Sequence, residues 1–375
     1  MKLALAILAI LAGELAWMFA TVPDFLSRAH GGDYPYYVQM AQTPLTTAVP
    51  SPWRYRVLNP WLASLLARTG ISIDVAFLLL TVAFAFASSM AMRSFLRRLS
   101  LSPFAADAGA ILFALSIGGY VPLRRYYGYT DALTNYLILV VLLAALIGRP
   151  LITAALLVCG TFAKESLLLL LPFVILRGRA LARPWHQIAI MAVAPIAVFA
   201  LLRWMIGSNG DASVALSWET QLAYWETAMV HGVARWILWS IAYSMGPIWL
   251  LAVLGARRHW RFLAAGLWLL IPLIAPIIRT TDTERALLLA FPVIFPLAVS
   301  LFDECRTTAE QRVLATVTSV AALGGQLTFD WVATPLIGGI SAKDIVFLTL
   351  FMLPMMVVLQ VRSPSAKAPL AWPGK

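Results

Sequence analysis

Basic residues recur beside carboxylates and tyrosines in five separated polar segments of an otherwise apolar chain. The first segment holds Asp33 in "GGDYPYY", and the second holds Arg54 and Arg56 in "PWRYR". A guanidinium group binds phosphate through paired hydrogen bonds, and a nearby carboxylate can take a proton from a hydroxyl group. These residues therefore predict a site for an anionic ligand, with Asp33 as the candidate general base.

Three further segments carry the same residue types. They are "VPLRRYYGYTDALTNY", the charged pair inside "CGTFAKESLLLLLP", and the turn that follows "IPLIAPII". Ionised groups between apolar half-spans are costly, and they generally pair or line a wet cavity. The predicted ligand contacts are Arg54, Arg56, Arg125, Tyr126, Asp131, Lys164, Glu165, Arg279, Glu284 and Arg285.

Each candidate also has a purely structural explanation, and the sequence leaves both open. Helix caps, ion pairs and lipid contacts use the same residue types as ligand sites. The structural alternatives are a helix cap for Asp33, lipid headgroup contacts for Arg54 and Arg56, an N-cap for Thr130 or Asp131, an internal ion pair for Lys164 and Glu165, and a salt-bridge cluster at 279–285.

Long apolar runs separated by short polar turns define the fold class. The 375 residues are 61% hydrophobic and 12% charged, and runs of about 17 to 25 apolar residues are typical of membrane-spanning helices. We therefore expect an all-α, polytopic transmembrane bundle of about 10–12 spans. The expected helices cover about 3–22, 72–92, 104–121, 131–148, 150–163, 166–176, 186–206, 233–255, 262–278, 286–302, 313–331 and 345–361. The fifth and sixth are short, so they are either two spans or one broken or re-entrant pair.

Basic clusters at every second turn predict the orientation. With the N-terminus in the cytoplasm, these clusters lie inside, as the positive-inside rule requires. The first outer loop, about 23–70, is expected to hold interfacial helices near 35–42 and 53–66, and a second outer segment covers about 207–232. We expect one transmembrane domain over residues 1–375 without a soluble domain.

The net charge of +11 is explained by cytoplasmic loops, so no nucleic-acid partner is expected. Only two cysteines occur, Cys159 and Cys305, and this argues against a disulfide framework or a thiolate metal site. No metal ligand is assigned and no cofactor is certain. A divalent metal is the one cofactor that stays under consideration.

The order of these features resembles the C-type polytopic membrane glycosyltransferases, in particular their uncharacterised bacterial members. The resemblance rests on "GGDYPYY", "PWRYRVLNPWLASLL", "TDALTNYLILVVLLAAL" and "TFAKESLLLLLPFVIL" within residues 1–300. It implies that Asp33 is the base and that Arg54, Arg56 and Arg285 contact phosphate. We expect the chain to depart from the larger members in having no soluble C-terminal domain, and it has Asp33 alone where they carry a paired acidic motif.

The resemblance implies a function at the bacterial inner membrane. A sugar would pass from a polyprenyl-phosphate donor to a lipid, glycan or protein acceptor on the periplasmic face, with both termini in the cytoplasm and membrane lipids around the bundle. Two alternatives stay open: a transporter or flippase for a lipid-linked or anionic solute, and a glycan polymerase or ligase that uses a diphosphate-linked donor.

Overall fold

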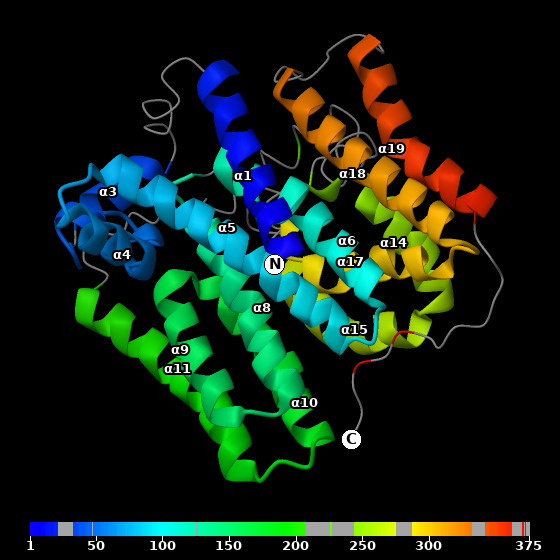
Figure 1. Ribbon diagram of the computed structural model, residues 1–375. Helices are drawn as coiled ribbons and strands as arrows, with labels where there is room; N and C mark the ends of the chain where they lie inside the picture. The colour runs from blue at the N-terminus through cyan, green and yellow to red at the C-terminus, as the bar shows by residue number, and fades with distance from the viewer. Residues whose placement is uncertain are drawn as a thin grey trace. The chain divides into compact units, whose positions relative to one another are not determined.

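The protein is all-helical throughout the part that its structure describes. A computed structural model describes residues 1–21, 33–46, 48–124, 127–207, 226, 244–274, 287–331, 342–361, 370 and 372, and no strand occurs among them (Figure 1). Within these ranges four helical segments are long and apolar enough to cross a membrane: Lys2–Thr21, Ile73–Arg98, Pro103–Leu123 and Trp185–Ile206. These segments indicate an α-helical membrane protein. The larger number of spans stays a prediction.

The chain divides into two compact units. The first contains Met1–Ala91 and Gly118–Gln221 with the last two residues, and the second contains Met92–Ile117 and Leu222–Pro373. The division falls within one long helix, α5 (Ile73–Arg98). Each unit is described by itself below, and the prediction of a single domain stays a prediction.

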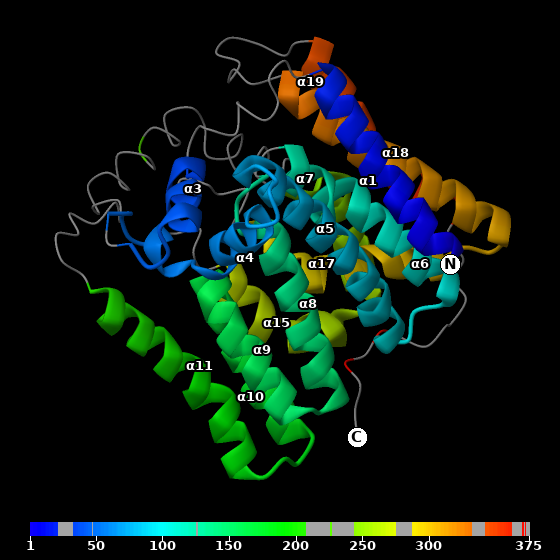
Figure 2. The same ribbon diagram turned by 60° about the vertical axis from the view of Figure 1, so that its left-hand side comes forward.

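In the first unit, short helices pack beside longer apolar ones. Helix α3 (Tyr34–Gln42) packs on α4 (Leu58–Ala67), while α9 (Pro150–Ala163) lies between α8 (Asp131–Ile147) and α11 (Trp185–Ile206) (Figure 2). The remaining elements of this unit are α1 (Lys2–Thr21), η1 (Trp53–Tyr55), α7 (Tyr120–Arg124), η3 (Glu165–Leu170) and α10 (Leu171–Ala180).

The helix break predicted after residue 163 occurs at Lys164. Helix α9 ends at Ala163, Lys164 has extended backbone angles (φ −164°, ψ 132°), and η3 begins at Glu165. With 14 residues, α9 is about 21 Å long, which is less than the roughly 30 Å of the hydrocarbon core. The break places two consecutive charged residues at the end of a short apolar helix.

The prediction of one continuous interfacial helix over 53–66 is wrong. The chain forms a 3₁₀ turn at Trp53–Tyr55, leaves the helical conformation at Arg56 (φ −91°, ψ 59°), and begins α4 at Leu58. Pro60 explains the interruption, because a proline lacks the N–H that a continuous helix needs and its ring clashes with the preceding turn. In the first turn of α4 the same proline is tolerated.

The helix expected over 104–121 is also interrupted. Helix α6 (Pro103–Phe113) passes into a wider π-helical turn, η2 (Ala114–Gly118), where Ser116 has non-helical backbone angles (φ −135°, ψ −106°). The Ser116 hydroxyl donates to the Leu112 carbonyl oxygen at 2.6 Å. Such a bond from a serine to the preceding turn competes with the regular helix and bends it.

The second unit contains α6 and the C-terminal helices. These are α14 (Pro247–Arg258), α15 (Trp260–Ile274), α17 (Phe291–Ser300), η5 (Leu301–Glu304), α18 (Thr308–Trp331) and α19 (Ala342–Val361). Helix α14 packs so closely on α17 that a Cβ added at Gly255 would lie 2.1 Å from the Leu297 carbonyl oxygen. Helices α18 and α19 lie side by side (Figure 1).

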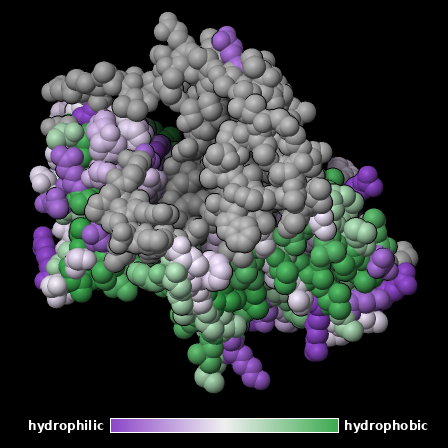
Figure 3. All heavy atoms as spheres, turned by 90° about the horizontal axis from the view of Figure 1, so that it is seen from above, coloured by the Kyte–Doolittle hydropathy of each residue, from purple (hydrophilic) through white to green (hydrophobic). Residues whose placement is uncertain are grey.

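Large apolar side chains cover much of the described surface. Hydrophobic residues gather in broad areas of the space-filling view (Figure 3). In α11, Trp185 and Trp204 at the two ends are 67% and 79% exposed, with Val193 and Ile196 exposed between them. A water-soluble protein rarely exposes so much apolar surface. The surface is therefore consistent with helices that face lipid.

Candidate functional site

Arg56 and Glu165 form a two-bonded ion pair in the first unit. The Arg56 Nε donates to Glu165 Oε2 at 3.0 Å, and Nη2 donates to Oε1 at 2.5 Å. Burial opposes ionisation of Glu165, but the Arg56 guanidinium outweighs it and lowers the pKa of Glu165 to about 2. Burial likewise opposes the charge on Arg56, and Glu165 more than restores it, so the pKa of Arg56 is raised. Both groups are therefore ionised at neutral pH.

Lys164 forms a separate ion pair with Asp131. The Lys164 Nζ lies 2.9 Å from Asp131 Oδ1, and the two side chains are only 13% and 17% exposed. The two consecutive residues at the helix break thus have different partners: Lys164 holds the first residue of α8, while Glu165 holds the segment before α4. Both residues are thus paired, each with a partner elsewhere in the chain, and their role as ligand contacts stays a prediction.

Tyr129 connects these pairs to the first loop. Its hydroxyl oxygen accepts from the Asp33 N–H at 3.0 Å, and its carbonyl oxygen accepts from Asn59 Nδ2 at 3.0 Å. Its ring contacts the ring of Tyr37 at 5.8 Å between centroids. The Tyr37 hydroxyl in turn accepts from Arg56 Nη1 at 3.2 Å. Asn59 was not among the predicted contacts, and its signal in the sequence is a single polar side chain between Leu58 and Pro60.

These contacts link four separate segments of the chain, and Asp33 takes part through its backbone N–H. The series of contacts runs from Asp33 through Tyr129 and Tyr37 to Arg56 and Glu165, then through Lys164 to Asp131, which is two residues from Tyr129. We call these seven residues the polar circuit. Two cations balance two carboxylates within it, and Asp33 adds a third carboxylate. Such a group can bind a polar ligand and position a proton acceptor.

A second tyrosine network supports the same region. Tyr34 donates a short hydrogen bond to Asp74, and its ring contacts Phe77 and Tyr127, each at 5.6 Å. Burial and the hydrogen bond to Asp74 raise the pKa of Tyr34, and burial raises the pKa of Tyr127 to about 12. Both phenols therefore stay protonated at neutral pH. They fix α3 against α5 and the segment before α8.

The structural alternatives for Arg54 and Asp33 were a lipid headgroup contact and a helix cap. Arg54 is 1% exposed and lies 5.6 Å from the Tyr55 ring centroid, so it does not extend into lipid headgroups. Arg56 is also buried, at 8%. Asp33 occupies the N-cap position of α3, but its side chain makes no capping hydrogen bond. Thr130 is likewise at the N-cap of α8 without a side-chain capping bond.

Five predicted contacts lie outside the residues that the structure describes. They are Arg125, Tyr126, Arg279, Glu284 and Arg285, as is most of the second outer segment, 207–232. The described part thus brings Arg56, Asp131, Lys164 and Glu165 together with Asp33. It leaves the roles of the other five as predictions.

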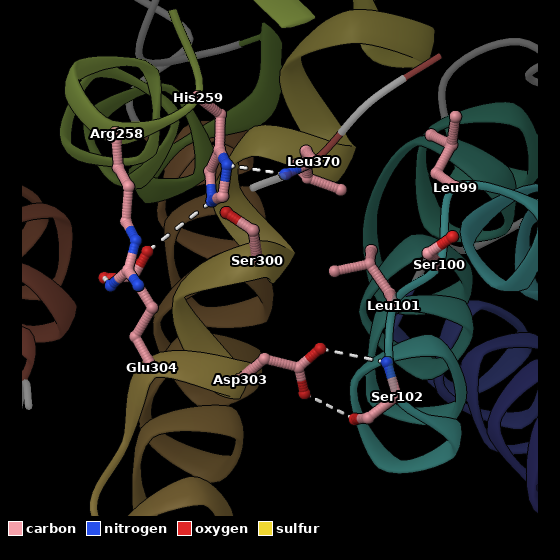
Figure 4. A pocket seen from close by; sticks show the side chains of 10 residues that line it. All are labelled: Leu99, Ser100, Leu101, Ser102, Arg258, His259, Ser300, Asp303, Glu304 and Leu370. Carbon is pink, nitrogen blue, oxygen red and sulfur yellow. Dashed lines mark hydrogen bonds and ion pairs between the residues drawn. The ribbon is translucent and has the colours of Figure 1, made fainter. Parts of the chain in front are cut away.

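A pocket in the second unit was not predicted. It has a volume of about 310 Å³ and lies where the ends of α5, α14 and η5 meet (Figure 4). His259 and Arg258 converge on Glu304, with their nitrogens each 3.5 Å from one of its oxygens, while Asp303 accepts from the Ser102 N–H at 2.9 Å. The signal was present in "RRHWR" and "FDECR", where charged residues flank apolar helices.

Metal coordination has no candidate in the described ranges. Among those residues, no group of three or more histidine, cysteine, aspartate or glutamate side chains is placed to hold a metal ion. The polar circuit contains three carboxylates, but two of them are held by Arg56 and Lys164.

Comparisons with known proteins give no family assignment. No known protein-family model matches the chain, and no curated protein is significantly similar to it in sequence. The resemblance to C-type glycosyltransferases therefore rests on the motifs and on the arguments from this chain's own residues.

Proposed function

We propose that this chain is a membrane glycosyltransferase that moves a sugar from a polyprenyl-phosphate donor to a lipid, glycan or protein acceptor. The observation that carries the proposal is the polar circuit, because it links the segment that begins at Asp33, held by its backbone N–H, to Arg56 and Lys164 from distant parts of the sequence. The polyprenyl tail would lie between apolar helices while the sugar phosphate reaches the circuit. In this proposal the bundle has about 10–12 spans, and the site faces the periplasm of a bacterial inner membrane.

Each residue type has a part in the proposed reaction. Asp33 takes the proton from the acceptor hydroxyl as this attacks the anomeric carbon, and the sugar–phosphate bond breaks. Arg56 and Lys164 stabilise the negative charge of the departing phosphate, together with Arg54, Arg125, Arg279 and Arg285. Asp131 and Glu165 hold the two cations in place before the donor arrives. Tyr126 and Glu284 complete the proposed contacts to the sugar and the phosphate.

The first test is sugar transfer from a panel of radiolabelled polyprenyl-phosphate sugars in proteoliposomes. Asp33→Asn removes the proposed base, and Asp107→Asn is the matched control because Asp107 is paired with Arg93 in the other unit. General base catalysis contributes about 10²- to 10⁴-fold, so Asp33→Asn should lose at least about 100-fold in rate while Asp107→Asn keeps wild-type activity.

Other outcomes would overturn the proposal. If Asp33→Asn transferred sugar as fast as the wild type, Asp33 would not be the base. If no donor were consumed but labelled lipid or solute crossed the bilayer, the chain would be a transporter. That alternative accounts equally for a broken helix with buried charges at Lys164.

A further inference from the structure

A basic, aromatic pocket lies at the junction of α14 and α15 in the second unit. It has a volume of about 510 Å³, and its lining includes Arg258, Arg261, Trp260, Phe262 and Trp372. None of its eight lining residues is acidic. It shares Arg258, His259 and Leu370 with the pocket in Figure 4, but Glu304 and Asp303 line only that neighbour. The pocket at the α14–α15 junction is thus the positively charged one of the two.

The two arginines of this pocket differ in their surroundings. Arg258 Nη1 lies 3.5 Å from Glu304 Oε2, so part of its charge is balanced within the protein. Arg261 is exposed, and its guanidinium carbon lies 5.7 Å from the Trp260 ring centroid. Arg257, which is also exposed, adds a third cation within five residues of sequence. The local charge is therefore positive even after the Glu304 carboxylate is counted.

Leu370 and Trp372 form one wall of the pocket. The Leu370 N–H donates to His259 Nδ1 at 2.8 Å. The Trp372 ring stacks on Phe262 at 4.6 Å between centroids and 12° between planes, and its Nε1 donates to the Phe262 carbonyl oxygen at 3.1 Å. These contacts hold the wall in place before a ligand arrives, which lowers the entropy cost of binding.

An exposed apolar stripe leads away from the pocket along α15. Trp260, Leu267, Trp268 and Ile271 are 60%, 40%, 60% and 57% exposed. Residues spaced by seven, eight and eleven positions lie on one face of a helix, and this face extends about 16 Å from Trp260. The buried residues of α15, Phe262, Gly266, Leu269 and Leu273, lie on the other side. The positive charge at one end is complementary to the headgroup of an anionic amphiphile, and the apolar surface beyond it is complementary to the chains.

We propose that this pocket binds the phosphate headgroup of an anionic phospholipid, whose acyl chains lie against the Trp260–Ile271 face of α15. Basic pockets between membrane helices bind phosphate headgroups through the same combination of charge and apolar contact. Trp260 lies at the boundary between the two, where an indole ring can contact both headgroup and chain. This site is independent of the polar circuit and of the proposed transferase activity.

Lipid binding is tested by native mass spectrometry of the full chain in detergent, titrated with phosphatidylglycerol or phosphatidylcholine. Arg261→Gln removes the exposed cation of the pocket, and Arg312→Gln is the matched control because Arg312 is an exposed arginine on α18. We expect about tenfold tighter binding of phosphatidylglycerol by the wild type. Arg261→Gln should bind it about fivefold more weakly, since one surface arginine contributes about that factor, while Arg312→Gln matches the wild type.

Three results would overturn this assignment. Equal binding of both lipids by the wild type would exclude a headgroup site. Equal losses of phosphatidylglycerol affinity in Arg261→Gln and Arg312→Gln would show a general attraction of the anionic lipid to a basic protein. If glycerol 3-phosphate bound the pocket with the same affinity as phosphatidylglycerol, the acyl chains would contribute nothing to binding. The pocket would then be a site for a soluble phosphate ester.

Discussion

Arg56 and Glu165 are separated by 108 intervening residues, yet their side chains meet in an ion pair with two parallel hydrogen bonds. The pair joins the segment before α4 to the helix break after α9. A second ion pair, Lys164–Asp131, joins the same break to the start of α8. Two ion pairs at one interruption thus connect three segments of the first unit around Tyr129.

We expect Arg56→Gln to destabilise the protein by about 2 kcal/mol, because it leaves the Glu165 carboxylate, whose side chain is 31% exposed, without the cation that is only 10% exposed. The Arg93–Asp107 pair offers a matched control, since its N–O distance is also 2.5 Å but its side chains are 39% and 40% exposed. Arg93→Gln should cost less than about 1 kcal/mol. The measurement is the free energy of unfolding of both variants in detergent. Equal losses would show that burial of the Arg56–Glu165 pair has no energetic effect.

Acid should weaken this ion pair in a defined pH range. The pKa of Glu165 is about 2 in the folded protein, below its ordinary value of 4.5. A lowered folded-state pKa means that the stabilisation is fully present above pH 4.5 and is lost as the pH falls toward 2. The measurement compares the melting temperatures of the wild type and Glu165→Gln between pH 6 and pH 2. The difference between them should shrink as the pH falls, and a constant difference would contradict the ion pair as its cause.

Tyr129→Phe should reduce the proposed sugar transfer by about fivefold, because it removes the acceptor of the Asp33 N–H. One such hydrogen bond contributes about 1 kcal/mol. Tyr136→Phe is the control, since the Tyr136 ring contacts Phe84 in the same unit. Initial rates with a saturating donor measure the effect. If both variants lost activity equally, the Tyr129 hydroxyl would have no special part in positioning Asp33.

Gly128→Ala should destabilise the first unit strongly, by roughly 2–4 kcal/mol, through both strain and overlap. Gly128 has φ +81°, and an added Cβ would lie 2.1 Å from the Tyr34 ring. Gly70 is a suitable comparison because it also has positive φ, at +95°, but nothing lies within 4 Å of its Cβ position. Gly70→Ala should therefore show only the backbone cost, about 1 kcal/mol. Thermal unfolding of both variants separates packing from strain.

Several helix boundaries could be predicted from the sequence because they depend on local features. The first helix was expected over 3–22 and runs Lys2–Thr21, and the helix expected over 150–163 runs Pro150–Ala163. Apolar length, prolines and turn residues determine such boundaries within a few positions. Pro60 was an equally local signal, and it would have predicted that no continuous helix covers 53–66.

The residue types of the candidate site were also readable from the sequence, since charged residues in apolar surroundings need partners wherever they lie. Which partner each one takes could not be predicted, because pairing depends on how separate helices pack. Lys164 and Glu165 are neighbours in sequence but bind Asp131 and Arg56. Likewise, "PWRYR" resembles the start of a lipid-facing helix, and only the tertiary structure, in which α3 and α11 pack on η1, buries Arg54 and Arg56. Hydropathy determined the class of protein and the approximate limits of its helices, whereas long-range packing decided which charges meet.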